Sequence, residues 1–178
     1  MDFKEKILTT EDIFKGFVFD VKLHTVELTD GSTARREALT HNGGVGIVAI
    51  DDEGKVFMVR QYRFCVDDIT LEIPAGKLEK GENPYDAAMR ELREETGYAT
   101  DELKLIGECY PTPAYCSEKI YLYLATELTY KGQKLDEDEF LNVERYDLDT
   151  LYNMVLGNKI LDAKTAIAIL KTKAILNK

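Results

Sequence analysis

The sequence contains no tryptophan and has only three cysteines, four prolines and two histidines among its 178 residues. The cysteines form no C-x-x-C pair and lie at no zinc-like spacing from a histidine, which excludes a structural zinc site and leaves reduced thiols as the expectation. No run of about eighteen apolar residues exists to form a spanning helix, and the first residues lack the apolar stretch of a signal peptide. We therefore expect a cytoplasmic protein with no membrane partner.

Positive charge is also scarce. Lysine and arginine number 23 against 33 aspartates and glutamates, so the formal net charge is -10. A nucleic-acid duplex or an anionic bilayer would be repelled over most of such a surface, which excludes nucleic acid as a partner. Anionic small molecules are then expected to bind only through local cations or metal ions. A hydrophobic content of 44% is enough for one sizeable core.

Alternating, β-rich patterns dominate the first half of the chain. Residues 16–40 read as a hairpin that turns at Asp30–Gly31, and we assign residues 1–43 to an N-terminal antiparallel β segment. Residues 44–178 are assigned to a single following domain. Its expected strands are residues 44–50, buried on both faces, 55–64, 69–76, 103–113, 118–128 and 140–148, and its last two helices lie near 147–157 and 161–176.

One more helix is predicted between Asn83 and Gly97. Asn83 suits the N-cap, Pro84 suits the first helical position, and Gly97 is a natural C-terminal stop. At the helical period the apolar face consists of Tyr85, Ala88, Met89 and Leu92. This face is expected to pack on the sheet.

Three glutamates, Glu91, Glu94 and Glu95, lie to one flank of that face. A solvated acidic face normally places a cation four residues after each glutamate, but Glu91 is followed at that distance by Glu95. Like charges so placed cost roughly a few tenths of a kcal/mol when exposed, and more when partly buried. We interpret the flank as an oxygen-rich cradle for a divalent cation such as Mg2+ or Mn2+. Arg90 is placed to pair with Glu94.

The spacing of these residues resembles the box of the Nudix hydrolases. Gly76, Glu82, Arg90-Glu91-Leu92, Glu94-Glu95 and Gly97 match the pattern G-x5-E-x7-R-E-U-x-E-E-x-G-U, and Tyr98 stands in the last, usually aliphatic, place. The resemblance implies an α+β fold, a Nudix-type α/β/α sandwich with a mixed central β-sheet, here preceded by the N-terminal β segment. It also implies cleavage of a nucleoside diphosphate linked to another moiety.

Three further features resemble the ADP-ribose pyrophosphatase branch of that family. Pro113 stands fifteen residues after Tyr98, and the stretches MVRQYRF and LDAKTAIAIL also look like the branch. The implied activity is Mg2+-dependent hydrolysis of ADP-ribose to AMP and ribose 5-phosphate. The loops depart from the branch, since Thr112-Pro113-Ala114 and His41-Asn42-Gly43 replace Ser-Pro-Gly and His-Pro-Gly. Two alternatives stay open: another nucleoside diphosphate sugar such as GDP-mannose, and a non-catalytic nucleotide-binding module.

The same resemblance assigns roles to individual residues. The implied metal ligands are Glu91, Glu94, Glu95 and the carbonyl of Ala75. The implied general base is Glu118, on the loop beyond Pro113, and Glu91 is its rival. The implied substrate-binding side comprises Arg36, Glu37, Arg63, Glu82 and Pro113, with Glu82 supporting the helix and a metal-bound water.

The resemblance also implies a homodimer formed through the N-terminal β segment. In related enzymes this segment crosses to the partner and helps to enclose the adenine. Because the chain has no tryptophan, a phenylalanine or tyrosine must stack on the base, and Phe17 and Phe19 are the candidates.

Overall fold

The computed structural model of the chain describes residues 3–135, 137 and 139–177. It divides into two compact units, one formed by Met1–Gly43 with Tyr110–Lys119 and the other by Gly44–Cys109 with Ile120–Lys178. None of the helices formed by the described residues is both long and apolar enough to cross a membrane.

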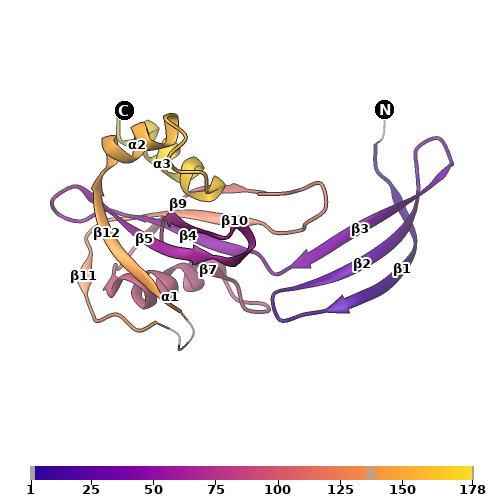
Figure 1. Ribbon diagram of the computed structural model, residues 1–178, viewed down its shortest axis with the longest axis horizontal. Coiled ribbons are helices and arrows are strands. Elements are labelled where there is room, and N and C mark those ends of the chain that lie inside the picture. Colours follow the sequence, from indigo (N-terminus) through magenta and orange to yellow (C-terminus); the bar gives the residue numbers. More distant parts are fainter. Residues whose placement is uncertain (1–2, 136, 138, 178) are drawn as a thin grey trace. The chain divides into compact units, whose positions relative to one another are not determined.

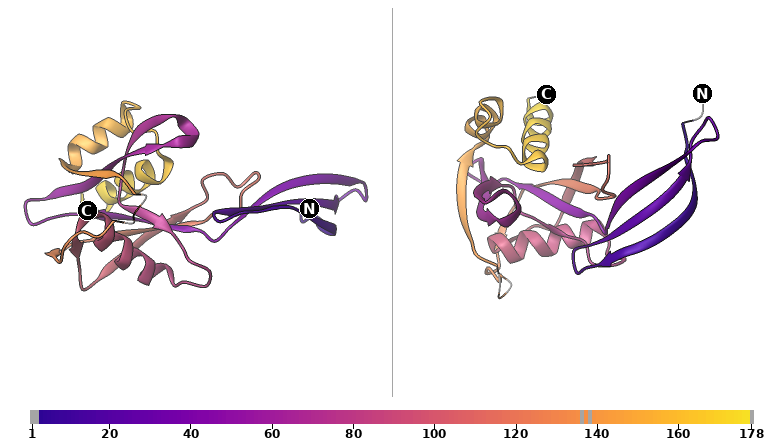
Figure 2. Two further views of the ribbon diagram at one scale, coloured as in Figure 1. Left: turned by 60° about the horizontal axis from the view of Figure 1, so that its bottom comes forward. Right: turned by 45° about the vertical axis from the view of Figure 1, so that its right-hand side comes forward.

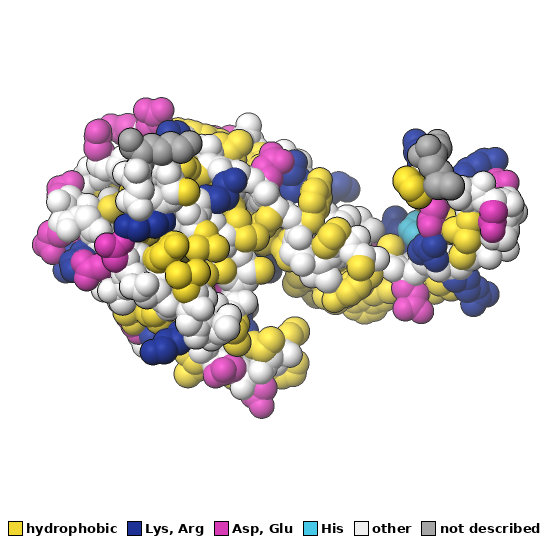
Figure 3. Space-filling model, turned by 90° about the horizontal axis from the view of Figure 1, so that it is seen from above, with side chains coloured by type: hydrophobic (Ala, Val, Ile, Leu, Met, Phe, Trp, Pro, Cys, Tyr) yellow, Lys and Arg dark blue, Asp and Glu magenta, His cyan; other side chains and the backbone are white. Residues whose placement is uncertain are grey.

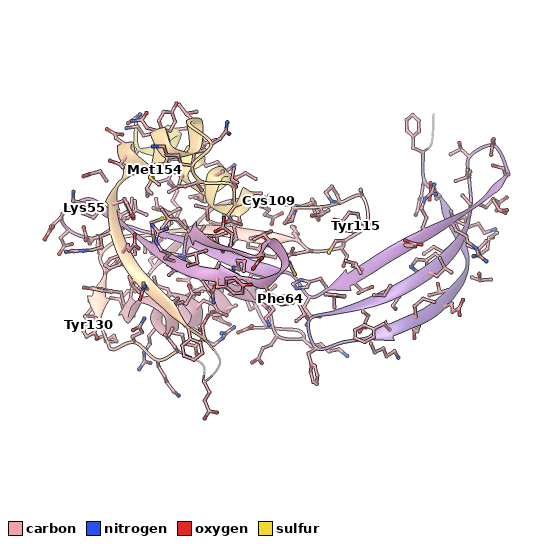
Figure 4. The ribbon with its side chains drawn as sticks, viewed as in Figure 1. Lys55, Phe64, Cys109, Tyr115, Tyr130 and Met154 are labelled. Atoms are coloured by element: carbon pink, nitrogen blue, oxygen red, sulfur yellow. The ribbon has the colours of Figure 1, made fainter. Side chains whose placement is uncertain are left out.

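The first unit contains an antiparallel sheet with the strand order β1-β2-β3 (Figure 1). Its strands are β1 (Lys6–Lys15), β2 (Phe19–Glu27) and β3 (Thr33–His41). The predicted hairpin is confirmed, and Gly31 in its turn has a φ of 83°, which glycine adopts without strain. The segment Tyr110–Lys119, in which Figure 4 labels Tyr115, bonds to β3. There Leu39 N–H donates to the Tyr115 carbonyl over 2.7 Å, and Ser117 N–H donates to the Leu39 carbonyl over 2.9 Å.

Strand β1 was not predicted as a separate element. Its pairing with β2 shifts register between Ile7 and Thr9 and again between Asp12 and Phe14. Each shift interrupts the alternation of side chains, so the period of two that identifies a strand in a sequence is lost. All ten residues of β1 are exposed.

The second unit contains a mixed sheet. In the order β7-β4-β10-β9, β4 runs parallel to β10 and antiparallel to β7. A second sheet has the order β12-β5-β6, and a short one pairs β11 with β8. The strands are β4 (Gly44–Ala49), β5 (Lys55–Arg63), β6 (Asp68–Glu72), β7 (Ala75–Lys77), β8 (Tyr98–Ala99), β9 (Leu103–Cys109), β10 (Ile120–Ala125), β11 (Thr129–Tyr130) and β12 (Leu141–Asp147), and a 3-10 turn, η1, spans Phe64–Val66.

Helices cover the sheets of this unit on opposite faces, α1 (Pro84–Thr96) on one and α2 (Leu148–Leu156) with α3 (Ala163–Leu176) on the other (Figure 2). Strand β4 is fully buried, as predicted, and its side chains divide between two cores. Val45 and Ile47 belong to the core that includes Leu92 of α1. Val48 belongs to the core that includes Ile169 of α3. The α/β/α sandwich is therefore confirmed.

The predicted boundaries of α1 are also confirmed. The N-cap is Asn83, whose Oδ1 accepts from Tyr85 N–H over 2.9 Å, and Pro84 takes the first helical position. At the other end Gly97 has a φ of 79°, and its N–H donates to the Arg93 carbonyl over 2.9 Å. These caps fix where the helix begins and ends, and so which way its glutamates face.

Candidate active site

Helix α1 buries its glutamates to different depths. Glu95 is 1% exposed, whereas the side chains of Glu91 and Glu94 are 12% and 33% exposed. The buried face is shifted from the predicted one, because Ala87 is fully buried and Tyr85 is 36% exposed. The shift turns the glutamates toward the interior of the protein, where α1 contacts β4 and β7.

Glu95 connects α1 to the start of β7. The N–H of Ala75 donates to Oε2 of Glu95 over 2.8 Å. Burial is the main influence on Glu95 and raises its pKa well above the usual range, against the lowering effect of the Ala75 bond. An ionised carboxylate at this depth is unfavourable unless a positive charge compensates it.

Glu91 lies against Gly76. Burial raises the pKa of Glu91, and Arg90 offsets part of this rise. A Cβ at position 76 would lie 1.8 Å from Oε1 of Glu91, so a glycine is needed to leave room for the carboxylate. Ala75, Gly76, Glu91, Glu94 and Glu95 are called the α1–β7 site below.

Gly76→Ala is expected to displace the Glu91 carboxylate while the protein stays folded, because the clash involves the end of a flexible side chain. We expect turnover to fall by roughly 100-fold, the scale seen when one preorganised electrostatic contact is lost. Steady-state kinetics with circular dichroism will test this. The matched control is Gly107→Ala, whose Cβ would meet the end of Lys171, 2.5 Å away. Equal activity of the two variants would contradict the role given to Gly76.

Arg90 binds three carboxylates at once. Its Nη1 donates to Glu91 Oε1 over 2.8 Å and to Glu94 Oε2 over 2.9 Å, and its Nε donates to Glu82 Oε1 over 3.1 Å. The predicted pair of Arg90 and Glu94 is thus confirmed. Burial lowers the pKa of Arg90, but its bonds to the three carboxylates outweigh burial and raise it. Glu82 therefore supports α1 through Arg90.

The donor set of the α1–β7 site suits a hard divalent cation. Carboxylate oxygens and a backbone carbonyl, here that of Ala75, are the ligands that Mg2+ and Mn2+ prefer. Among the described residues, no three acidic, histidine or cysteine side chains are already gathered as ligands of one ion. Instead, Arg90 bridges Glu91 and Glu94. When Glu82 and Glu95 are ionised as well, four carboxylates stand against one guanidinium, which leaves negative charge for a cation.

Arg63, a predicted substrate residue, is held by a buried carboxylate. It ends β5 beside Phe64, which Figure 4 labels, and its Nε and Nη2 each donate to Glu72 over 2.7 Å. Glu72 is 2% exposed. Burial alone would raise the pKa of Glu72, but Arg63 and Lys164 lower it to about 2. No pattern in the sequence indicates that Arg63 pairs with Glu72.

Glu72→Gln should lower the free energy of unfolding at neutral pH by about 3 kcal/mol. This is the stabilisation that corresponds to a pKa lowered on folding from 4.5 to about 2. A carboxyl group whose pKa is lowered by folding stabilises the folded state at pH values above its pKa in the unfolded chain. This stabilisation is lost as the pH falls toward the lowered pKa. The deficit of the variant should therefore shrink between about pH 5 and pH 2. Urea unfolding across this range will measure it, with the exposed Glu53→Gln as control. A deficit that does not change with pH would contradict the assignment.

Glu139 is a charged residue near the α1–β7 site that the sequence analysis does not single out. Its negative charge raises the pKa of both Glu91 and Glu95, so it lies within electrostatic reach of two glutamates of the α1–β7 site. It precedes β12, about forty residues beyond the box, where local spacing gives no indication of proximity.

The other predicted residues, Arg36, Glu37, Pro113 and Glu118, belong to the first unit. The guanidinium of Arg36 binds Glu5, with Nη2 2.5 Å from Oε1 and Nε 3.0 Å from Oε2. One carboxylate oxygen of Glu118 lies 3.7 Å from Nδ1 of His41. The α1–β7 site and Arg63 belong to the second unit.

Comparison with known proteins agrees with the family resemblance of the sequence. The family model described as NUDIX domain matches residues 40–166. The ADP-ribose pyrophosphatase of Bacillus subtilis (strain 168) is 44% identical over 168 residues, 93% of this chain and 91% of that protein. The methanol dehydrogenase activator of Bacillus methanolicus is 42% identical over 169 residues, 94% of this chain and 91% of that protein. A crystal structure of ADP compounds hydrolase matches with a TM-score of 0.87 and 26% identity, covering 98% of this chain and 95% of that one.

Proposed function

The chain belongs to the Nudix hydrolase family, and on that premise we propose that it hydrolyses ADP-ribose to AMP and ribose 5-phosphate. The observation that carries the proposal is the α1–β7 site in a chain that is 44% identical to an ADP-ribose pyrophosphatase. Desolvated Glu95 and the recess that Gly76 provides for Glu91 are the features of a cation site.

Glu91, Glu94, Glu95 and the Ala75 carbonyl would hold a divalent cation, Mg2+ or Mn2+. When bound, such an ion lowers the pKa of water and neutralises charge on phosphate oxygens. The bonds of Arg90 with Glu82 fix the orientation of α1. Arg63 presents a guanidinium that suits phosphate oxygens.

A carboxylate must take the proton from the attacking water. The water oxygen forms a bond to one phosphorus, the bridging P–O bond breaks, and the bridging oxygen leaves on the other phosphate. Glu118 is the base expected from the family resemblance, and Glu139 is a second candidate because its charge reaches Glu91 and Glu95. The two candidates are separated by variants described in the Discussion.

The proposal is tested by product analysis with a substrate panel. ADP-ribose and GDP-mannose are incubated with the protein in Mg2+ or Mn2+, and the nucleotides are resolved by chromatography. We expect AMP from ADP-ribose at a higher kcat/KM than GMP from GDP-mannose. A preference for GDP-mannose would move the assignment to the alternative substrate. Nucleotide binding without any product would favour the non-catalytic module.

The exposed β1 strand supports a homodimer as part of the proposal. Ile7, Ile13 and Phe14 are 58%, 54% and 55% exposed, and Figure 3 shows hydrophobic side chains at the surface of this sheet. Strand β1 is an edge, since it pairs with β2 alone in its sheet. An exposed edge strand with apolar side chains readily pairs with another chain. A second copy of this chain is the proposed partner.

Ile13→Glu should shift the protein from dimer to monomer, because it places a charge within the proposed interface. Sedimentation velocity will measure the change, and Glu11→Gln, on the same exposed strand, is the control. A wild-type protein that sediments as a monomer would contradict the dimer. The cytoplasmic location expected from the sequence stays a prediction.

A further inference from the structure

The start of α3 carries a motif, Asp162-Ala163-Lys164-Thr165, to which the proposed reaction gives no role. Asp162 caps the helix, because its Oδ2 accepts from the N–H of Thr165 over 3.0 Å and from its hydroxyl over 2.5 Å. The same hydroxyl accepts from the N–H of Ile73 over 3.0 Å. The helix start is thereby tied to the chain that leads from β6 into the α1–β7 site.

Lys164 shares the carboxylate of Glu72 with Arg63. Its ammonium donates to Oε2, which also accepts from Nη2 of Arg63, while Oε1 accepts from Nε of Arg63 and from the hydroxyl of Thr70. The side chains of Glu72, Lys164 and Arg63 are 3%, 12% and 41% exposed. Arg63 is thus the most exposed of the three side chains, and the groups that hold its guanidinium are more deeply buried.

Arg63 and Lys164 together carry one more positive charge than the Glu72 carboxylate that they share, so positive charge is left to attract an anionic ligand. If Arg63 were the sole cation on Glu72, the buried carboxylate would cancel its charge and compete with any anionic ligand. Asp162 also lies 3.0 Å from Nζ of Lys164, but it caps α3, where the helix dipole already favours a negative charge. The two hydrogen bonds of Arg63 to Glu72 use its Nε and Nη2 atoms.

The charge of Arg63 is coupled to the α1–β7 site. Burial is the main cause of the raised pKa of Glu95, and the charge of Arg63 offsets part of this rise. The pKa of Arg63 is raised mainly by its bonds to Glu72, and the charge of Glu95 adds to this rise. A ligand held by a cation at Glu95 therefore comes within the electrostatic range of Arg63. Bidentate guanidinium binding suits the oxygens of a diphosphate.

We propose that Lys164 is a positioning residue for the substrate: by neutralising Glu72 it leaves the Arg63 guanidinium available to bind a phosphate group. The inference deepens the proposed function and rests on it, since it assumes a diphosphate-containing substrate. Removal of Lys164 would leave Arg63 bound more tightly to Glu72 and less available to the phosphate.

The test compares Lys164→Met with Lys173→Met, which removes another salt-bridged lysine, the partner of Asp149, from the last turn of the same helix. With ADP-ribose, we expect Lys164→Met to raise KM about tenfold, the effect of weakening one charge-assisted contact, and to change kcat little. Lys173→Met should keep the wild-type KM. A wild-type KM for Lys164→Met would overturn the inference.

A second comparison separates positioning from a merely structural role. If Lys164 acts through Arg63, the double variant Arg63→Gln/Lys164→Met should have the same KM as Arg63→Gln alone. Lys164→Arg, which keeps the charge, should restore KM. Effects that multiply in the double variant would overturn the inference. If Lys164→Met does not fold, Lys164→Gln, which keeps a hydrogen-bond donor but not the charge, takes its place in every comparison.

Failure of the proposed function is recognised separately. If the wild-type protein does not hydrolyse ADP-ribose, the proposed function is rejected, and the binding of inorganic diphosphate in Mg2+ buffer, measured by calorimetry, decides the role of Lys164. Weaker binding by Lys164→Met than by Lys173→Met supports the inference. Equal binding by the two variants, or no binding by the wild type, overturns it.

Discussion

Glu95→Gln should lower the turnover of ADP-ribose by at least roughly 100-fold, because a buried carboxylate proposed to hold the metal is lost. The same change should raise the thermal midpoint of the metal-free protein at neutral pH. Burial raises the pKa of Glu95 well above the usual range, so the ionised form destabilises the folded state without a cation. A glutamine oxygen can still accept from Ala75 N–H.

The two effects together distinguish a metal ligand from a structural residue. Steady-state kinetics and differential scanning calorimetry in a chelating buffer will measure them. Glu91→Gln should lower turnover by a similar factor. Asp86→Asn, at an exposed position in the first turn of α1, is the matched control and should keep wild-type activity. Wild-type turnover by both Glu91→Gln and Glu95→Gln would reject the assignment of the site.

If Glu139 is the general base, Glu139→Gln should lower kcat by about 100-fold to 10,000-fold, with metal affinity close to that of the wild type. Glu139 is tested because its charge raises the pKa of Glu91 and Glu95 and so places it near the α1–β7 site. Glu118→Gln, the variant indicated by family resemblance, is measured beside it. Single-turnover kinetics and Mn2+ titration report the two quantities separately.

The outcome identifies the base directly. A large loss of kcat in Glu139→Gln alone assigns the role to Glu139, and a large loss in Glu118→Gln alone assigns it to Glu118. If both variants retain wild-type kcat, Glu91 becomes the base, as the sequence interpretation allowed. Loss of Mn2+ binding by Glu139→Gln would instead make Glu139 a ligand.

The elements that the sequence predicted well are those with local causes. The boundaries of α1 follow from Asn83, Pro84 and Gly97, which act within one turn of the helix ends. The pair of Arg90 and Glu94 follows from the i,i+4 spacing. Family resemblance supplied the sandwich that the structure confirms.

The interactions that the sequence did not predict are formed by residues far apart in the chain. Lys164 and Glu72 are 92 residues apart, and no pattern at either position indicates that they meet. The bonds of segment 110–119 to Leu39 likewise depend on tertiary folding. Burial also rotated the packed face of α1 toward Ala87 and Glu95, since packing against β4 and β7 outweighs the apolar period of an isolated helix.

The central claim is that the glutamates of α1 bind a divalent cation that relieves their desolvation and mutual repulsion. Calorimetric titration of Mg2+ into the wild-type protein and into Glu95→Gln tests it most directly, without any assumption about substrate. We expect saturable heat from the wild type and none from the variant. Binding curves that coincide would contradict the claim, as would the absence of binding by the wild type at millimolar Mg2+.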